Sequence, residues 1–220
     1  MSRIKIFTGH FGSGKTEVAI NFAINSANEN KNTAIVDLDI VNPYFCTRSL
    51  KDELNKKGVK VISSDPDLLN AELMVVPAEV LSVFNDKSYQ AFFDVGGDDQ
   101  GAVALGQFNR FFKSEPYDMY YVINNKRPFT SNIEDTEKYI KFIEAASRLK
   151  VTHLISNNNL SYETTVSDIL KGDKLVEELS RKLRIPHAYT VCRKDLADKV
   201  QGKVSAKVFS IDIYMKTPWE

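Results

Sequence analysis

The sequence contains only two cysteines, Cys46 and Cys192, and they form no Cys-x-x-Cys pair. We therefore expect neither an iron–sulfur cluster nor a zinc site, and a reducing, cytoplasmic location is the simplest interpretation. No apolar run approaches the length of a transmembrane helix, and the first strand-like segment starts too early for a signal peptide. The sequence thus predicts a protein that does not insert into a membrane.

An excess of charge of one sign is also lacking. The 29 Lys and Arg residues balance the 29 Asp and Glu residues, and the net charge is +0. No global field therefore favours nucleic acid or an anionic lipid surface, and we expect no nucleic-acid partner. With 43% hydrophobic and 26% charged residues in a chain of 220, the composition is that of a globular protein with a substantial core. We expect a single domain over residues 1–220.

One octapeptide near the N-terminus carries most of the functional information. It fits the pattern G-x-x-x-x-G-K-[ST] and consists of Gly9, His10, Phe11, Gly12, Ser13, Gly14, Lys15 and Thr16. Backbone N–H groups of such a loop surround the β-phosphate of a nucleotide. Lys15 supplies a cation for the β- and γ-phosphate oxygens, and Thr16 supplies a hydroxyl for Mg²⁺.

The context of this loop supports the same interpretation. A β-branched and aromatic run at 4–8 precedes it, and apolar residues recur at helical spacing over 18–27. The loop is therefore expected at a helix N-terminus, whose partial positive charge favours phosphate.

Strand-like and helix-like segments alternate along the chain. This order predicts an α/β fold, a three-layer sandwich with a mostly parallel, twisted sheet and helices on both faces. Strands are expected at 4–8, 33–39, 59–62, 91–95, 119–123, 151–155 and 188–191. Helices are expected at 18–27, 47–57, 77–84, 102–112 and 133–149, with Gly172 separating two further helical pieces, while 64–76 is ambiguous. Apolar and polar residues alternate after Val204, so 204–220 is expected to be an extended tail packed on the domain.

Carboxylates follow two of the expected strands. Asp94 ends the apolar run 91–95, where an acid is costly without a partner. Water-bridged Mg²⁺ is a natural partner, so Asp94 is expected to act as the Walker B acid, with capping of a turn as the alternative. Gly97 completes a D-x-x-G spacing, which lets a bare N–H approach the γ-phosphate.

Asp37 and Asp39 close the strand 33–39. The two-residue period of a strand places both side chains on the same side. We expect Asp37 to lie near the magnesium ion and Asp39 to orient the attacking water. Helix capping and turn formation are the alternative, but they do not account for two acids on a buried strand.

Together these motifs resemble the MinD/ParA/CobQ-CobB branch of P-loop proteins, within the SIMIBI class. The runs 9–17, 36–45 and 94–99 look like those of an uncharacterised group of bacterial nucleotide-binding proteins in that branch. The resemblance extends to about Val200. It implies that Lys15 and Thr16 hold phosphate and Mg²⁺, that Asp39 positions water, that Asp94 is the Walker B acid and that Gly97 belongs to the second switch.

The chain departs from this family at one position. Members of the branch with the deviant loop carry a lysine directly after the first glycine, and in dimers this lysine reaches the phosphates of the partner. Here the position is His10, and a neutral imidazole does not replace a permanent cation. A homodimer that sandwiches nucleotide is thus left open. The candidates for the missing charge are Arg48, Lys126 and Arg127.

The base of the nucleotide can be predicted from the acid and amide side chains that would recognise it. The run 125–128 nearly matches the N-K-x-D guanine reader, but Pro128 stands where the acid should be, which disfavours GTP. A side-chain amide offers adenine both an acceptor and a donor. Asn157, just after the strand 151–155, resembles the adenine position of the family, and backbone groups near 190–193 complete the expected pocket. ATP and ADP are therefore the expected ligands.

Three functions remain open at this point. The first is a Mg²⁺-dependent ATPase that signals its nucleotide state through switch segments to an unknown protein partner. The second is a small-molecule transferase or ligase resembling dethiobiotin synthetase, with 64–76 and Arg127 lining an acceptor pocket. The third is a nucleotide-gated binding module with negligible turnover.

Overall fold

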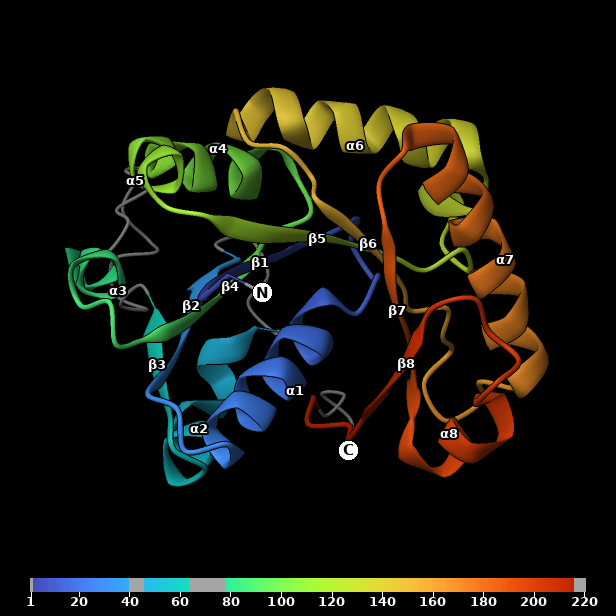
Figure 1. Cartoon of the computed structure of the whole chain (residues 1–220), viewed down its shortest axis with the longest axis horizontal. Coiled ribbons are helices and arrows are strands. Elements are labelled where there is room, and N and C mark those ends of the chain that lie inside the picture. Colours follow the sequence, from blue (N-terminus) through green and yellow to red (C-terminus); the bar gives the residue numbers. More distant parts are fainter. Residues whose placement is uncertain (1, 40–45, 64–77, 216–220) are drawn as a thin grey trace.

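The computed structural model describes residues 2–39, 46–63 and 78–215 (Figure 1). The described strands form one eight-stranded sheet in the order β3-β2-β4-β1-β5-β6-β7-β8, and every pair is parallel. The strands are β1 (Ile4–Thr8), β2 (Thr33–Leu38), β3 (Val59–Ser63), β4 (Gln90–Val95), β5 (Tyr117–Ile123), β6 (His153–Ser156), β7 (His187–Arg193) and β8 (Lys207–Ile211). The predicted mostly parallel sheet is confirmed.

Helices cover both faces of this sheet. The α-helices are α1 (Lys15–Asn28), α2 (Lys51–Lys56), α3 (Ser82–Asn85), α4 (Asp99–Gln107), α5 (Asn109–Ser114), α6 (Ile133–Ser147), α7 (Val166–Leu183) and α8 (Lys194–Val200). Short 3₁₀ turns lie at η1 (Thr47–Leu50), η3 (Ala78–Leu81) and η4 (Pro128–Thr130). Figure 1 shows α1 and α2 on one side of the sheet and α4, α5 and α6 on the other. Two separate apolar clusters fill the two interfaces, which confirms the three-layer sandwich.

The sheet topology gathers the predicted motifs at one edge. β1 lies between β4 and β5, so the loop after β1 is at the centre of the sheet. Asp37 of β2 and Asp94 of β4 are direct register partners. Because the carboxyl ends of parallel strands meet at the same edge, ligands of such folds bind there.

Two helix predictions need correction. Gly172 does not separate two helical pieces, because α7 is continuous from Val166 to Leu183. A Cβ atom at this position would lie 2.3 Å from Cβ of Asn158, so the glycine permits close packing of α7 on the loop after β6. The expected helix 102–112 starts earlier and is split at Phe108 into α4 and α5. Asp98 caps α4 by accepting a hydrogen bond from the N–H of Gly101.

Within the tail expected over 204–220, the structure has the strand β8, which pairs with β7. Phe209 packs against Phe22 of α1, with 4.1 Å between the ring centroids. The segment 64–76 and Pro77 lie outside the described residues. Within the described part of the chain, no helix has both the length and the apolar character needed to cross a membrane.

Candidate functional site

Residues 9–14 join β1 to α1, and Lys15 and Thr16 begin the helix, so the predicted order of strand, loop and helix is present. Gly14 is the N-cap of α1, with φ of 79°, and no side chain caps this helix end. The first N–H groups of a helix have no intrahelical partner and carry partial positive charge. An uncapped, left-handed glycine turn at a 14-residue helix therefore leaves donors available to an anion.

Side chains from the ends of β5 and β6 hold the carbonyl groups of this loop. Asn124 and Arg127 donate to the carbonyl oxygen of Gly12 at 3.3 and 3.2 Å, and Asn157 donates to that of Ser13 at 2.8 Å. The N–H of Ser13 donates to the carbonyl oxygen of His10 at 2.9 Å, so the loop is held by its own backbone as well as by these three side chains. Asn124 is fully buried, and sequence reasoning missed its role.

Lys15 is buried against the acidic strand ends. Its ammonium donates to Oδ2 of Asp39 at 2.7 Å, and both side chains are almost fully enclosed. Burial alone would lower the pKa of Lys15, but the carboxylates of Asp94 and Asp39 outweigh this effect and hold it above its ordinary value. The lysine is thus kept charged at the position where the motif requires a cation.

Asp94 lies beside the predicted magnesium ligand. The hydroxyl of Thr16 donates to Oδ1 of Asp94 at 3.2 Å, and the hydroxyl of Thr47 donates to Oδ2 at 2.9 Å. Burial raises the pKa of Asp94, while Lys15 opposes the shift. Thr47 was missed from the sequence, since nothing in the local run at 46–50 distinguishes a hydroxyl aimed at an acid from a helix-start threonine.

Asp37 is engaged by groups other than the phosphate loop. It accepts hydrogen bonds from the N–H groups of Asp39 and Arg48, each at 3.0 Å, and its Oδ2 lies 3.4 Å from the Arg48 guanidinium. Burial, with the nearby charge of Asp94, raises the pKa of Asp37 to about 7. An added cation at this acidic cluster would favour the ionised form of its carboxylates.

The described residues fit a magnesium ion of the kind found with nucleotides. No group of three or more His, Cys, Asp or Glu side chains within the described ranges forms a cage for a metal. Mg²⁺ at such sites takes one or two protein oxygens and completes its shell with phosphate and water. Thr16 and Asp94, adjacent and buried, are oxygen groups of this type.

Gly97 lies directly against the phosphate loop. A Cβ atom at Gly97 would be 2.2 Å from the carbonyl oxygen of Gly9 and 2.9 Å from the N–H nitrogen of Phe11. Only a glycine therefore allows the segment after β4 to approach this closely. The predicted approach of the Gly97 N–H to a γ-phosphate stays a prediction.

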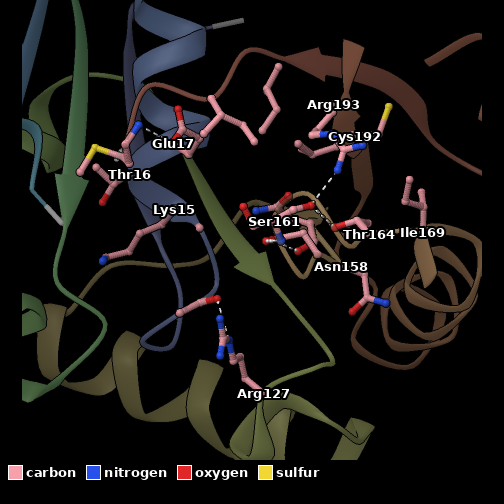
Figure 2. Close-up of a pocket in the computed structure, with 18 of the residues that line it drawn as sticks. Lys15, Thr16, Glu17, Arg127, Asn158, Ser161, Thr164, Ile169, Cys192 and Arg193 are labelled. Carbon is pink, nitrogen blue, oxygen red and sulfur yellow. Dashed lines mark hydrogen bonds between the residues drawn. The ribbon is translucent and has the colours of Figure 1, made fainter. Parts of the chain in front are cut away.

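A cleft of about 350 Å³ opens next to the loop (Figure 2). The lining residues come from the loop and the start of α1, from the segments after β5 and β6, from the start of α7 and the end of β7, and from β8 with its extension. They include Gly12, Lys15, Thr16, Glu17, Arg127, Asn157, Asn158, Asn159, Val191, Cys192, Arg193, Ile211, Ile213 and Met215. The end of β7 borders the cleft, and its expected role in a base pocket stays a prediction.

Asn157 lines this cleft, but its amide has another contact. The amide nitrogen donates to Ser13 and lies so close to Gly14 that a Cβ atom there would be 2.4 Å away. The donor end expected to face adenine is thus bound to the loop. Of the run 125–128, only Arg127 borders the cleft among the described residues, so this run is not placed as a base reader.

His10 points its ring toward α6. The imidazole packs edge-on against Tyr139, with 4.7 Å between ring centroids, and lies 5.0 Å from the Phe129 ring. The His10 side chain does not border the cleft. The loop backbone at this position remains part of the expected phosphate cradle.

The three cations considered as substitutes for the signature lysine have different surroundings. Arg48 lies against Asp37, and Lys126 forms an ion pair of 2.6 Å with Asp168. Arg127 is exposed, borders the cleft and uses Nε to donate to Gly12. Figure 2 shows its side chain reaching up to the loop. Of the three, Arg127 is the one whose guanidinium lies at the mouth of the cleft.

Solved structures share this fold. FtsY from Mycoplasma mycoides matches with a TM-score of 0.55 and 19% identity, over 85% of this chain and 59% of that chain. FtsY from Elizabethkingia anophelis, in complex with GDP, matches with a TM-score of 0.57 and 15% identity, over 86% and 56%. A nucleotide-binding protein from Archaeoglobus fulgidus, in complex with ADP, matches with a TM-score of 0.50 and 15% identity, over 89% and 84%.

The chain has the three-layer α/β fold of P-loop NTPases. It spans less than two thirds of the FtsY chains that it matches. Neither the family models nor the curated proteins include a match to the sequence. At these identities the structural likeness concerns the fold.

Proposed function

We propose that this protein binds ATP together with Mg²⁺ and hydrolyses it slowly on its own. The observation that carries the proposal is one constellation at the uncapped start of α1. Lys15 contacts Asp39 there, and the hydroxyl of Thr16 contacts Asp94. A cation, a metal-binding hydroxyl and a buried acid are the groups that phosphoryl transfer requires around the γ-phosphate.

We propose adenine rather than guanine as the base. Guanine recognition by N-K-x-D proteins uses a carboxylate, and among the described residues lining the cleft Glu17 is the only acid. Both of its oxygens already accept backbone N–H groups, from Tyr214 at 2.7 Å and from Met215 at 3.0 Å. Asn157, Asn158 and Asn159 border the same space, but each amide nitrogen already donates to a carbonyl oxygen, of Ser13, Asp168 and Asn157 respectively. The proposed preference for adenine therefore rests on the lack of an available carboxylate among the described lining residues.

In this proposal, each residue of the constellation has its own role. Lys15 exchanges its contact with Asp39 for the β- and γ-phosphate oxygens, and Asp39 is left beside the position of the attacking water. Thr16 and Asp94 would hold Mg²⁺, directly or through water, and the ion would neutralise charge on the phosphates. Asp37 keeps Arg48 and the backbone after β2 in place.

We further propose that Arg127 supplies in cis the charge that His10 does not supply. Its guanidinium is held over Gly12 by the Nε contact, and the planar fork suits phosphate oxygens. Catalysis would then not require a second copy of the chain, although a homodimer is compatible with this arrangement.

Nucleotide state would be signalled through the segments that meet at Asp94. Thr47 follows the 40–45 segment and binds Asp94, and Gly97 touches the phosphate loop. Occupation of the γ-phosphate position would alter both contacts, and we propose that a protein partner detects this change, as in MinD/ParA-like proteins. The transferase alternative places both 64–76 and Arg127 at an acceptor pocket, and the segment 64–76 lies outside the described residues.

Calorimetry with ADP or a non-hydrolysable ATP analogue, with and without Mg²⁺, tests the proposal. Lys15→Ala should weaken binding about 100-fold or more and abolish phosphate release, whereas Lys174→Ala, an exposed lysine on α7, should change neither. Absence of heat with folded wild-type protein, or hydrolysis retained by Lys15→Ala, would refute the assignment. Binding without any turnover would favour the gated binding module, and transfer of phosphate to a small acceptor would favour the transferase.

A further inference from the structure

The segment after β8 forms one wall of the cleft beside the phosphate loop. Ile211, Ile213 and Met215 all border the cleft. Their two-residue spacing is that of an extended chain with alternate side chains on one side. Tyr214, between them, instead borders a separate polar hollow that includes Lys57, whose ammonium lies 5.4 Å from the Tyr214 ring centroid.

Two side chains of α1 hold this segment by its backbone. The amide of Asn21 both donates to the carbonyl oxygen and accepts from the N–H of Asp212, each at 2.9 Å. One turn earlier, Glu17 accepts the N–H groups of Tyr214 and Met215. Residues at i and i+4 share one helix face, so α1 offers the tail four hydrogen bonds in a row.

The position of Glu17 connects the tail to the cleft. Glu17 follows Thr16 directly in the sequence and lies partly buried beside the cleft (Figure 2). The wall it fixes and the polar segment 157–159 border the same space. This combination of apolar side chains with a few polar groups is the usual composition of a small-molecule pocket.

We propose that Ile211, Ile213 and Met215 form the apolar wall against which the base of the nucleotide packs, and that Glu17 is the positioning residue that holds this wall. The inference rests on the proposed nucleotide-binding function and extends it. The C-terminal segment becomes a determinant of affinity for the base, separate from the groups that hold the phosphates.

Calorimetry with two probes separates base from phosphate: ADP and inorganic tripolyphosphate, which has no base. Ile213→Ser should weaken ADP binding about tenfold while the tripolyphosphate affinity changes by less than about twofold. Glu17→Ala should weaken ADP binding similarly, and Glu17→Gln should weaken it less because the amide oxygen keeps one acceptor. Tyr214→Leu is the matched control because the Tyr214 side chain points away from the cleft. This variant should bind ADP as the wild type does.

Unchanged ADP affinity in Ile213→Ser, shown to be folded by circular dichroism, would overturn the inference. So would wild-type protein that binds tripolyphosphate as tightly as ADP, although the phosphate site would then stand. Absence of binding to both probes would overturn the proposed function as well. If Glu17→Ala does not fold, Ile213→Ser alone decides, because it leaves every backbone contact of the tail in place.

Discussion

Thr47 donates a hydrogen bond of 2.9 Å to the carboxylate of Asp94, which lies 47 residues further along the chain. Both side chains are fully buried. The contact links the segment after β2 to the end of β4, on the side of Asp94 opposite Thr16. Asp94 is therefore oriented by two hydroxyl groups from separate parts of the sequence.

Replacement of Thr47 by valine tests this link. The change keeps the shape of the side chain and leaves one oxygen of a buried acid without its donor, so we expect a loss of about 1–3 kcal/mol in the free energy of unfolding. The gain in ADP affinity on adding Mg²⁺ should also shrink. Chemical denaturation and calorimetry measure the two effects, and Thr47→Ser, which retains the hydroxyl, should recover most of both. Equal stability of Thr47→Val and wild type would contradict the assigned contact.

Arg127 should contribute to the binding and hydrolysis of ATP, whereas Lys126 should not. We expect Arg127→Ala to lower the affinity for an ATP analogue about tenfold and the hydrolysis rate at least as much, because a charge-assisted contact to phosphate is lost. Arg127→Lys should be intermediate, since it keeps the charge without the fork. Lys126→Ala is the neighbouring control, because that ammonium is paired with Asp168. Equal losses in both alanine variants would argue against a specific role for Arg127.

Gly172 should not tolerate a methyl group in the middle of α7. Alanine is the better helix former by about 1 kcal/mol, yet its Cβ atom would meet Cβ of Asn158 at 2.3 Å. Overpacking of this kind costs about 1–3 kcal/mol, so we expect Gly172→Ala to lower the free energy of unfolding. Lys171→Ala, at an exposed position of the same helix, should change it by less than about 0.5 kcal/mol. A stabilised Gly172→Ala variant would show that α7 can move away from the loop after β6.

The stability of the protein should carry a pH dependence from Glu17. Burial raises the pKa of Glu17 from 4.5 to about 7, and the nearby charges of Asp212 and Glu53 act in the same direction, while the N–H groups of Tyr214 and Met215 oppose it. The folded protein therefore binds this proton more tightly than the unfolded chain. The contribution of protonated Glu17 to the free energy of unfolding is fully present below about pH 4.5, and it is lost as the pH rises through about 7.

Glu17→Gln isolates this contribution. As the pH rises from acid to mildly alkaline values, the wild type should lose on the order of 3 kcal/mol of unfolding free energy relative to the variant, which has no titrating group at this position. Urea denaturation at a series of pH values measures it, and Glu79→Gln, at an exposed position, provides the control profile. A difference that stays constant with pH would show that Glu17 titrates alike in the folded and unfolded chain.

Much of the site follows from local sequence. The loop 9–16 has one conformation that suits its glycines, and the acids after β2 and β4 are recognisable because charge at the end of a buried strand needs a partner. Alternation of strand and helix then fixes the parallel sheet, and a parallel sheet brings its carboxyl ends to one edge. Asp37, Asp39, Asp94 and Lys15 meet there for that reason.

Other features depend on packing between distant segments. Gly172 has the sequence character of a helix breaker, and only its contact with Asn158 shows why it lies inside a helix. Asn157 has the residue type expected of an adenine reader, and the structure shows its amide nitrogen bound to the phosphate loop. A residue type defines what a side chain can bind, whereas its partner is set by which other groups the fold brings within hydrogen-bonding distance.

The phosphate loop, the alternating α/β order and the acids at the strand ends could all be predicted from the sequence, because each depends on the chemistry of adjacent residues. Three contacts became visible only in the folded chain: Thr47 binds Asp94, Arg127 lies over Gly12, and Glu17 holds the tail. These contacts join residues far apart in the chain. Their geometry arises from the sheet order and from the docking of β8 and its extension on α1, neither of which any local pattern encodes.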